Sequence, residues 1–249
     1  MQEKNTHFGY QDVSPGEKTE KVSAVFDSVA SKYDVMNDVM SFGLHRVWKH
    51  QLVYLANVQP CHKVLDLAAG TADLSALLAP KLAEQGEITL CDLNLTMLEH
   101  GRGKLVDKGL LKNLHYVQAM AEVLPFRENY FDRVVLAFGL RNFTDKSQAL
   151  RAIFRVLKPG GQLLVLEFSK AHKWLRKAYD SYSFGFLPKM GKIVARDAGS
   201  YRYLAESIRK HPDPDTLRSM LESAGFQQCD FLDLGFGIVC IHRGYKLSA

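Results

Sequence analysis

The segment from Lys63 to Asp73 constrains the fold more than any other part of this chain of 249 residues. It opens with an apolar run, continues with small residues around Gly70, and leads into leucines at helical spacing. We expect a buried strand, a tight turn that lets the backbone approach a ligand, and then a helix. This order is typical of the nucleotide-binding opening of a doubly wound α/β sheet.

A second apolar run, from Ile88 to Cys91, ends in Asp92, where a carboxylate can accept hydrogen bonds from ribose hydroxyls. The turn lacks the G-x-G-x-x-G spacing of dinucleotide-binding proteins, and Asp66 at the end of the first strand would repel a pyrophosphate. S-adenosylmethionine fits better, because it has no phosphate and its ammonium group can meet Asp66. An ordinary core strand and turn is the alternative interpretation of this segment taken alone.

The composition, with 47% hydrophobic and 24% charged residues, is typical of a globular protein. No apolar run approaches the ~20 residues of a membrane-spanning helix, and the N-terminal residues lack a signal-peptide core. The four cysteines are scattered without a Cys-x-x-Cys pair, so we expect no zinc site, no other metal and no disulfide framework. The chain is therefore expected to be a cytoplasmic protein.

Positive charge is concentrated between Lys170 and Arg196, where seven lysines and arginines stand against one acid, Asp180. Aromatic side chains are interleaved with these cations, Trp174 among them. Such a stretch predicts an RNA contact, an anionic membrane surface or only a solvated helix face. The residues alone leave all three open.

Hydrophobic periodicity predicts two helices before the first strand: one covers 18–30, and the segment 31–49 leads into the second, which reaches about Leu55. Residues 1–17 are expected to be loosely ordered, apart from Phe8 and Tyr10. Four β-α repeats and a fifth strand from Gln162 to Phe168 follow, and Asp213-Pro214 begins a last helix before two strands. We expect one domain over 1–249 with four parts, namely a helical arm, a cofactor-binding half, a helical insert, and a C-terminal helix with a hairpin, over residues 1–60, 61–169, 170–212 and 213–249.

The predicted fold class is α/β. We expect a doubly wound, mostly parallel, seven-stranded sheet with an antiparallel last strand, an N-terminal helical arm and a helical insert after the fifth strand. In such a sheet the ligand lies at the carboxyl ends of the strands. The loop over 119–126 and the residues 139–142 both leave that edge, which places Arg141 and Asn142 at the crevice. A turn-stabilising pair is the other role open to these two residues.

Two stretches carry a family resemblance: Tyr33-Asp-x-Met-Asn-x-x-Met-Ser-x-x-x-His-x-x-Trp48 and Arg155-Val-Leu-Lys-Pro-Gly-Gly-Gln-Leu-Leu-Val-Leu-Glu-Phe-Ser169. With them, over about residues 6 to 246, the chain resembles class I S-adenosylmethionine-dependent methyltransferases, which are Rossmann-like. More closely, it resembles the ubiquinone/menaquinone biosynthesis C-methyltransferase family.

The resemblance implies methyl transfer from S-adenosyl-L-methionine to a ring carbon of a polyprenyl benzoquinol or of demethylmenaquinol. The cofactor-binding residues it implies are Tyr33, Gly70, Thr71, Asp92, Met120, Ala121 and Ala137. Ala69 and Ala72 stand where the family has glycines, and Met120 where it has a polar side chain. An alanine at a positive-φ position costs about 1 kcal/mol, so we expect these changes to affect cofactor affinity rather than cofactor identity.

Arg141 and Asn142 are the catalytic candidates, because the reaction needs groups that favour a phenolate and accept a proton. His45 and Tyr201 rank behind them.

The partners implied are a polyprenyl quinol, an anionic membrane touched peripherally on its inner face by residues 170–196, a quinone-biosynthesis complex and a homodimer. Nucleic acid is not expected, because Gly139-Leu-Arg-Asn142 stands where nucleic-acid methyltransferases carry Asn/Asp-Pro-Pro-aromatic. A nucleic-acid enzyme and a non-catalytic scaffold in a lipid-quinone synthesis complex stay open as alternatives.

Overall fold

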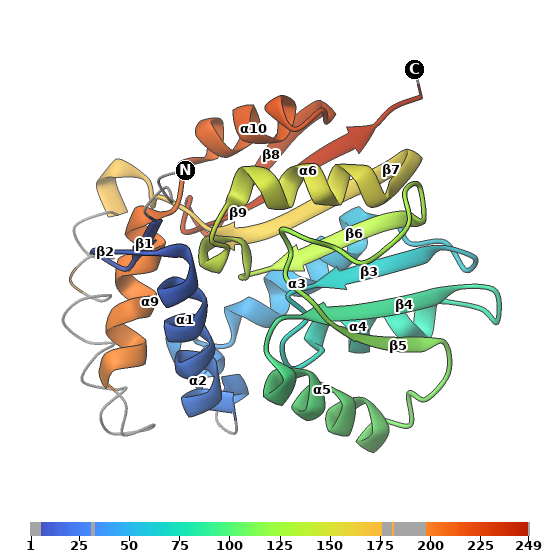
Figure 1. Ribbon diagram of the computed structural model, residues 1–249, viewed down its shortest axis with the longest axis horizontal. Helices are drawn as coiled ribbons and strands as arrows, with labels where there is room; N and C mark the ends of the chain where they lie inside the picture. Colours follow the sequence, from blue (N-terminus) through green and yellow to red (C-terminus); the bar gives the residue numbers. More distant parts are fainter. Residues whose placement is uncertain (1–5, 31–32, 176–180, 182–197, 249) are drawn as a thin grey trace.

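The computed structural model describes residues 6–30, 33–175, 181 and 198–248. Its centre is a seven-stranded sheet in the order β5-β4-β3-β6-β7-β9-β8 (Figure 1). The strands are β3 (Lys63–Leu67), β4 (Glu87–Asp92), β5 (Leu114–Gln118), β6 (Phe131–Ala137), β7 (Leu157–Phe168), β8 (Gln227–Leu234) and β9 (Val239–Lys246).

The sheet is mostly parallel, as predicted, and β9 runs antiparallel between β7 and β8. β3 pairs in parallel with β4 on one side and β6 on the other, so Leu67 lies opposite both Cys91 and Leu136. The strand order therefore reverses at β3. In doubly wound sheets the ligand crevice lies outside the carboxyl ends of the strands at this point.

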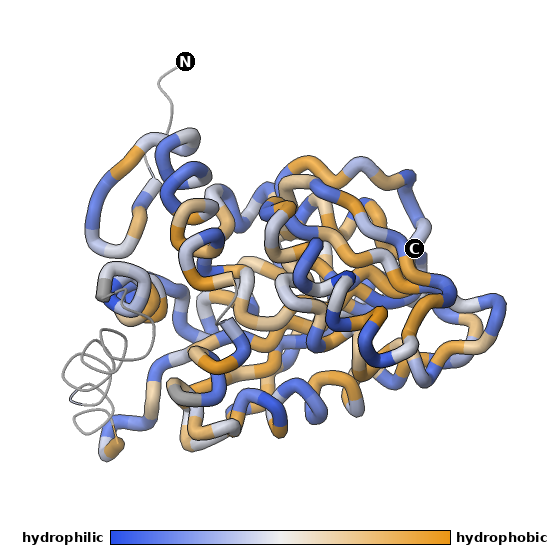
Figure 2. The backbone as a smooth tube through the Cα atoms, turned by 90° about the horizontal axis from the view of Figure 1, so that it is seen from below, coloured by the Kyte–Doolittle hydropathy of each residue, from blue (hydrophilic) through white to orange (hydrophobic). Residues whose placement is uncertain are grey.

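Alternate side chains of β3 enter the two cores of the molecule. Val64 packs with α3 (Leu44–Ala56), α4 (Asp73–Leu78) and α5 (Leu95–Asp107), whereas Leu65 packs with α6 (Lys146–Val156) and α10 (Pro214–Ser223). Figure 1 shows α6 and α10 above the sheet and α5 below it. Figure 2 shows hydrophobic and hydrophilic residues interleaved along the helical turns of the backbone, as expected where one side of a helix packs on the core and the other faces solvent.

The N-terminal arm consists of a small hairpin, β1 (Thr6–Phe8) and β2 (Gln11–Val13), followed by α1 (Pro15–Val29) and α2 (Tyr33–Ser41). Figure 1 shows α1, α2 and α9 (Ala198–Lys210) together at the carboxyl edge of the sheet. About half of the predicted insert, residues 176–180 and 182–197, lies outside the described residues. Among those described, no helix is long and apolar enough to cross a membrane.

Residues 6–17, which were expected to be loosely ordered apart from Phe8 and Tyr10, form the β1–β2 hairpin and the start of α1. Phe8 of the hairpin stacks on Tyr203 with ring centroids 4.1 Å apart, a contact between residues too distant in sequence to be seen in a local pattern. Ser14 begins α1 through a capping box with Glu17, which moves the helix start to Pro15.

Two other boundaries differ from the prediction. The segment that leads into the second predicted helix contains a helix of its own, α2, which is separate from α3 because Phe42 and Gly43 both take positive φ (51° and 75°). β7 begins at Leu157 rather than Gln162, since Leu157 pairs with Phe131 and the residues of Pro159-Gly160-Gly161 form an irregularity within the strand.

We predict opposite effects of alanine at two glycines of α5. A Cβ at Gly101 would lie 2.9 Å from the carbonyl oxygen of Gly70, whereas a Cβ at Gly103 meets no atom within 4 Å. Gly103→Ala should raise the free energy of unfolding by about 0.5–1 kcal/mol through helix propensity. Gly101→Ala should lower it by about 1–2 kcal/mol, because overpacking outweighs that gain. Urea denaturation measures both, and equal changes would contradict the close contact between α5 and the turn.

Candidate active site

The main cleft, of about 800 Å³, opens at the carboxyl edge between the arm and the sheet. Its walls come from α1, the turn after β3, the end of β4, the loop after β5 and the end of β6. The predicted site residues that line it are Tyr33, Gly70, Asp92, Met120, Ala121, Ala137 and Asn142.

Asp92 holds the turn after β3 in place. Its carboxylate accepts a hydrogen bond from the backbone N–H of Gly70 (2.8 Å) and another from that of Asn94 (2.9 Å). Burial raises the pKa of Asp92, and these N–H donors oppose the rise. An ionised carboxylate accepts about four hydrogen bonds, and the backbone N–H groups of Gly70, Leu93 and Asn94 do not use all of this capacity, so Asp92 can still accept from a ligand hydroxyl.

The turn is tightly wound and lies close to the end of β6. Ala68 and Ala72 both have positive φ (53° and 62°), which costs about 1 kcal/mol for an alanine, whereas Ala69 does not take positive φ. A Cβ at Gly139 would lie 2.6 Å from the Ala68 Cβ. The close approach of these two loops therefore requires glycine at position 139.

The rest of the main cleft is largely apolar. Phe26 comes from the arm, Met97 from α5, and Met120 and Ala121 from the loop after β5. Met120 offers a polarisable thioether where an amide or carboxylate would accept a hydrogen bond. A flat aromatic ring is the kind of group that this wall suits.

Thr71 lies beside the main cleft, in a smaller charged cavity of about 310 Å³ that is also lined by Tyr33 and Gly70. Its hydroxyl donates to Asp34 of α2 (2.8 Å), and Lys104 of α5 pairs with the other oxygen of Asp34 (2.6 Å). Lys104 also pairs with Asp73 of α4, which in turn binds Lys49 of α3 (2.5 Å). This network joins the arm to three helices of the sheet domain.

Asp66 also lines the charged cavity and is almost fully buried. It accepts hydrogen bonds from the Ser75 hydroxyl (2.7 Å) and the Ser75 backbone N–H (3.1 Å). Burial nevertheless raises the pKa of Asp66 to about 7. A cationic group placed beside Asp66 would return that pKa toward its ordinary value.

A third space, the arm cavity, of about 570 Å³, lies between the arm, α9 and the short helix η3 (Leu140–Asn142). Arg141 lies here rather than in the main cleft: its Nη1 donates to Glu167 Oε1 (2.8 Å) and to the Phe138 carbonyl. The Nε of Arg141 is buried and has no hydrogen-bond partner among the residues that the structure describes. Asn142 Oδ1 accepts a hydrogen bond from the Tyr203 hydroxyl (2.9 Å).

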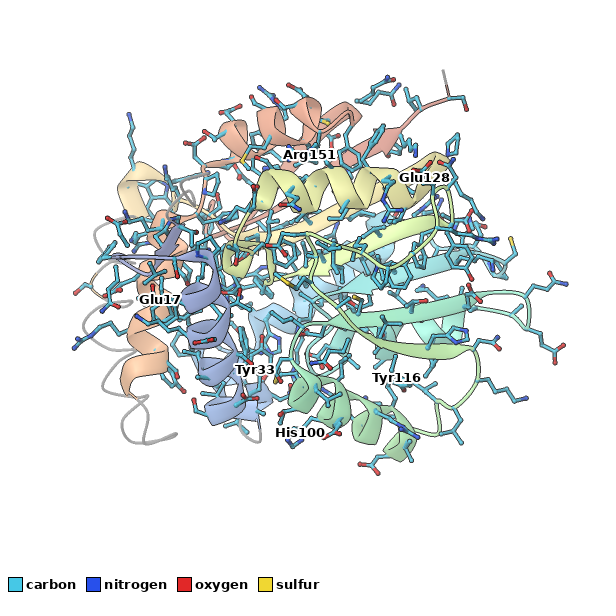
Figure 3. All side chains as sticks on the ribbon, viewed as in Figure 1. Glu17, Tyr33, His100, Tyr116, Glu128 and Arg151 are labelled. Atoms are coloured by element: carbon cyan, nitrogen blue, oxygen red, sulfur yellow. The ribbon has the colours of Figure 1, made fainter. Side chains whose placement is uncertain are left out.

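Tyr33 lines all three spaces, and Figure 3 shows it on the side of the arm that faces the sheet. The main cleft and the arm cavity also share Phe26, Phe138 and Asn142. Ligands in the two spaces would therefore be neighbours across one wall. The Phe138 backbone takes positive φ (59°) at this point, a strain that proteins keep at functional positions.

Sequence reasoning missed the charged residues that surround the predicted ones. Asp34, Lys49, Asp73 and Lys104 come from four separate elements, so no local spacing indicates that they meet. Glu167, the partner of Arg141, stands at the end of the fifth predicted strand, which was its only signal.

The residues present fit S-adenosylmethionine. Asp92 supplies free acceptor positions for a ribose, the apolar wall of the main cleft suits an adenine ring, and the raised pKa of buried Asp66 indicates a carboxyl that a cation would stabilise.

Comparison with known proteins assigns the chain to a family. The model of the ubiE/COQ5 methyltransferase family matches residues 15–246. The chain belongs to this family. The match covers both stretches that carried the resemblance, together with α1, α2 and the C-terminal hairpin, and it begins after the β1–β2 hairpin.

Members of the ubiE/COQ5 family from Shewanella are similar over almost their whole length. The ubiquinone/menaquinone biosynthesis C-methyltransferases UbiE of Shewanella sp. strain W3-18-1 and Shewanella baltica strain OS155 are each 57% identical to this chain over 244 residues. Each alignment covers 98% of this chain and 97% of the relative.

Solved structures share the fold of this family member at low identity. The [4+2]-cyclase SpnF has a TM-score of 0.69 and 15% identity, covering 93% of this chain and 97% of its own. A SAM-dependent methyltransferase from Aquifex aeolicus has a TM-score of 0.60 and 16% identity, covering 80% and 89%. These likenesses show the class I methyltransferase fold.

We predict that Asp73 stabilises the protein in a pH-dependent way. Burial disfavours its carboxylate, but Lys49 and Lys104 overcome this and hold the pKa of Asp73 below the ordinary 3.8. Breaking a part-buried ion pair costs a few kcal/mol, so Asp73→Asn should lower the free energy of unfolding by about 2 kcal/mol at pH 7. The deficit should shrink as the pH falls below 3.8, because the carboxyl then binds a proton in the unfolded chain while the two lysines still keep it ionised in the folded protein, and it should vanish only once the folded carboxyl is protonated too.

Urea denaturation at several pH values measures this difference. Asp215→Asn is the matched control, because Asp215 pairs with Arg218 on the exposed face of α10 and should change stability by less than about 0.5 kcal/mol. A deficit in Asp73→Asn that is the same at pH 3 and pH 7 would contradict the ionic origin.

Proposed function

We propose that this protein is an S-adenosylmethionine-dependent C-methyltransferase that methylates a ring carbon of a polyprenyl benzoquinol or of demethylmenaquinol. One observation carries the proposal: the main cleft, with Asp92 holding its turn, shares the wall of Tyr33, Phe138 and Asn142 with the apolar arm cavity that contains Arg141. The 57% identity to UbiE proteins of ubiquinone/menaquinone biosynthesis supports the same reaction.

In this proposal the cofactor lies in the main cleft and extends into the charged cavity. Asp92 binds the ribose hydroxyls, Met120 and Ala121 contact the adenine ring, and Asp66 receives the ammonium group. Gly70, Thr71, Ala137 and Tyr33 complete the contacts through the walls that the two spaces share. When bound, S-adenosylmethionine supplies an electrophilic methyl group on a sulfonium.

The quinol ring lies in the arm cavity, next to the shared wall. Arg141 stays charged at any ordinary pH, and its unpartnered Nε is a donor for a phenolate oxygen of the substrate. Glu167 fixes the guanidinium from behind through the bond to Nη1. Because Asn142 Oδ1 is occupied by Tyr203, its Nδ2 donors are left to orient the other ring oxygen.

Holding the nucleophilic carbon in line with the methyl group is the main task of the site. Well-oriented reactants can save about 7–11 kcal/mol of barrier relative to free reactants in solution. Phe26, Phe138 and Tyr33 line both spaces and mark the place where the two reactants would meet. An electron-rich quinol ring provides the nucleophile once one hydroxyl is ionised.

The polyprenyl tail gives the basic, aromatic segment a role at the inner face of an anionic membrane. Most of that segment lies outside the described residues, but Trp174 at its start is 69% exposed and contacts Phe236, which is 64% exposed. Lys170 and Lys173 lie close to Trp174 in sequence. Exposed aromatics next to lysines are typical of peripheral membrane contacts.

Anaerobic turnover with purified protein tests the reaction. Reduced demethylmenaquinol and a reduced polyprenyl methoxybenzoquinol are incubated separately with S-adenosylmethionine, and the products are analysed by mass spectrometry. We expect a species one methyl group heavier from the quinol and none from the oxidised quinone, whose ring is not nucleophilic. Cofactor binding without methylation of either quinol would overturn the proposal and favour the scaffold.

We predict that cofactor binding releases a proton from Asp66. With a pKa of about 7, this carboxyl is half protonated at pH 7 in the free protein, and an ammonium neighbour lowers that pKa. Calorimetry in buffers of different ionisation enthalpy should therefore show release of about half a proton at pH 7 and less at pH 8.5.

Asp66→Asn should abolish this release and weaken cofactor affinity about tenfold or more, as the loss of one charged contact. The matched control is Asp230→Asn, which removes an exposed partner of Arg243 far from the cleft and should leave the proton release unchanged. Equal release from wild type and Asp66→Asn would rule out Asp66 as the source.

A further inference from the structure

His45 is a buried histidine in the first turn of α3 that lines the arm cavity together with Arg141 and Asn142. Only 5% of its surface is exposed. Its Nε2 lies 2.9 Å from Asp38 Oδ1, and its Nδ1 is buried with no hydrogen-bond partner in the described part of the chain. The backbone N–H of His45 donates to the Ser41 hydroxyl, which fixes the start of the helix that carries it.

The contact with Asp38 decides which ring nitrogen of His45 carries the proton. Arg46 holds Asp38 ionised through two hydrogen bonds (2.9 and 2.6 Å), which lower the pKa of Asp38 to about 2. An ionised carboxylate can only accept, so Nε2 of His45 donates and Nδ1 keeps its lone pair. A base oriented by a third group is the arrangement that enzymes use to remove protons.

The surroundings of His45 lower the pKa of its ring, so that the ring is neutral at neutral pH. Burial is the largest effect and lowers this pKa, and Lys49 also lowers it. Asp38 and Asp73 oppose these effects and raise it. Arg141 faces the same cavity from η3. A neutral imidazole at neutral pH is the form that can accept a proton.

Two residues that line the arm cavity thus each carry a buried polar atom that has no hydrogen-bond partner among the described residues, the Nε donor of Arg141 and the Nδ1 acceptor of His45. An unsatisfied buried polar atom costs about 1–3 kcal/mol, so a purely structural role would leave both costs unexplained. A quinol ring carries two oxygens, of which one can accept from Arg141 while the other donates its hydrogen to His45. One donor and one acceptor at the cavity therefore match the two oxygens of the quinol ring.

Resting on the proposed function, we propose that His45 is the proton acceptor of the reaction and that Asp38 is its positioning residue. The O–H bond of one quinol hydroxyl breaks, the proton forms an N–H bond at Nδ1, and the electron pair stays on the phenolate oxygen. After methylation the ring C–H proton leaves to solvent water and its electron pair restores the aromatic ring. The regenerated phenolate takes the proton back from Nδ1, which returns His45 to its neutral form.

The test measures kcat against pH at saturating S-adenosylmethionine, so that the titration of Asp66 in the free protein does not contribute. Wild type should lose activity at acidic pH as His45 becomes protonated. His45→Gln should lower kcat at neutral pH by about 10²–10⁴-fold, the usual contribution of a general base. It should also lose the acidic limb, and its rate should rise toward alkaline pH as the quinol ionises by itself.

Asp38→Asn provides a second, milder variant. Because the carboxylate raises the pKa of His45, its removal should move the acidic limb to lower pH and reduce kcat, a change that loss of packing alone would not produce. His50→Gln, on the exposed side of the same helix, is the control and should match wild type. Cofactor affinity within about threefold of wild type, measured by calorimetry, verifies that each variant is folded.

The outcomes separate this inference from the proposed function. If wild type methylates neither quinol, the proposed function fails. If wild type is active and His45→Gln keeps kcat within about threefold, or loses kcat while keeping the same acidic limb, the role of His45 as proton acceptor is overturned alone.

Discussion

The hydrogen bond from the Gly70 N–H to the Asp92 carboxylate is the constraint on which the site depends. It joins the turn after β3 to the end of β4, at the point where the strand order reverses. With this bond in place the turn cannot move away from the sheet edge, although two of its alanines take positive φ. The same carboxylate can still accept hydrogen bonds from a ligand, so one side chain both fixes the turn and contributes to ligand binding.

The arm is attached to this edge by charges as well as by apolar packing. Asp34 reaches Thr71 and Lys104, while Asn94 at the start of α5 donates to Asp27 of α1 (2.8 Å). Buried or part-buried ion pairs add little net stability, because desolvation offsets much of the Coulomb attraction. Their contribution here is geometric: they hold Tyr33 in the wall that the three spaces share.

The sheet and its crevice could be predicted from local patterns, whereas the surroundings of the site could not. The run Leu114–Gln118 has a local signal in its strand-forming residues, and the acid at Asp92 has one in the buried strand that it ends. The pairing of Arg141 with Glu167 joins two strand ends, and Phe8 stacks on a residue almost at the other end of the chain. Such contacts depend on the folded topology, and single-sequence periodicity does not contain them.

The stacking of Phe8 on Tyr203 has a practical consequence. Tyr203 binds Asn142, so the first hairpin lies one aromatic ring away from the reacting groups. Lys246, by contrast, pairs with Gly161 at the amino-terminal edge of the parallel strands, the far side of the sheet. A fluorophore, affinity handle or surface linker placed ahead of Thr6 would therefore sit next to the reaction chamber, whereas one attached beyond Lys246 would leave it undisturbed.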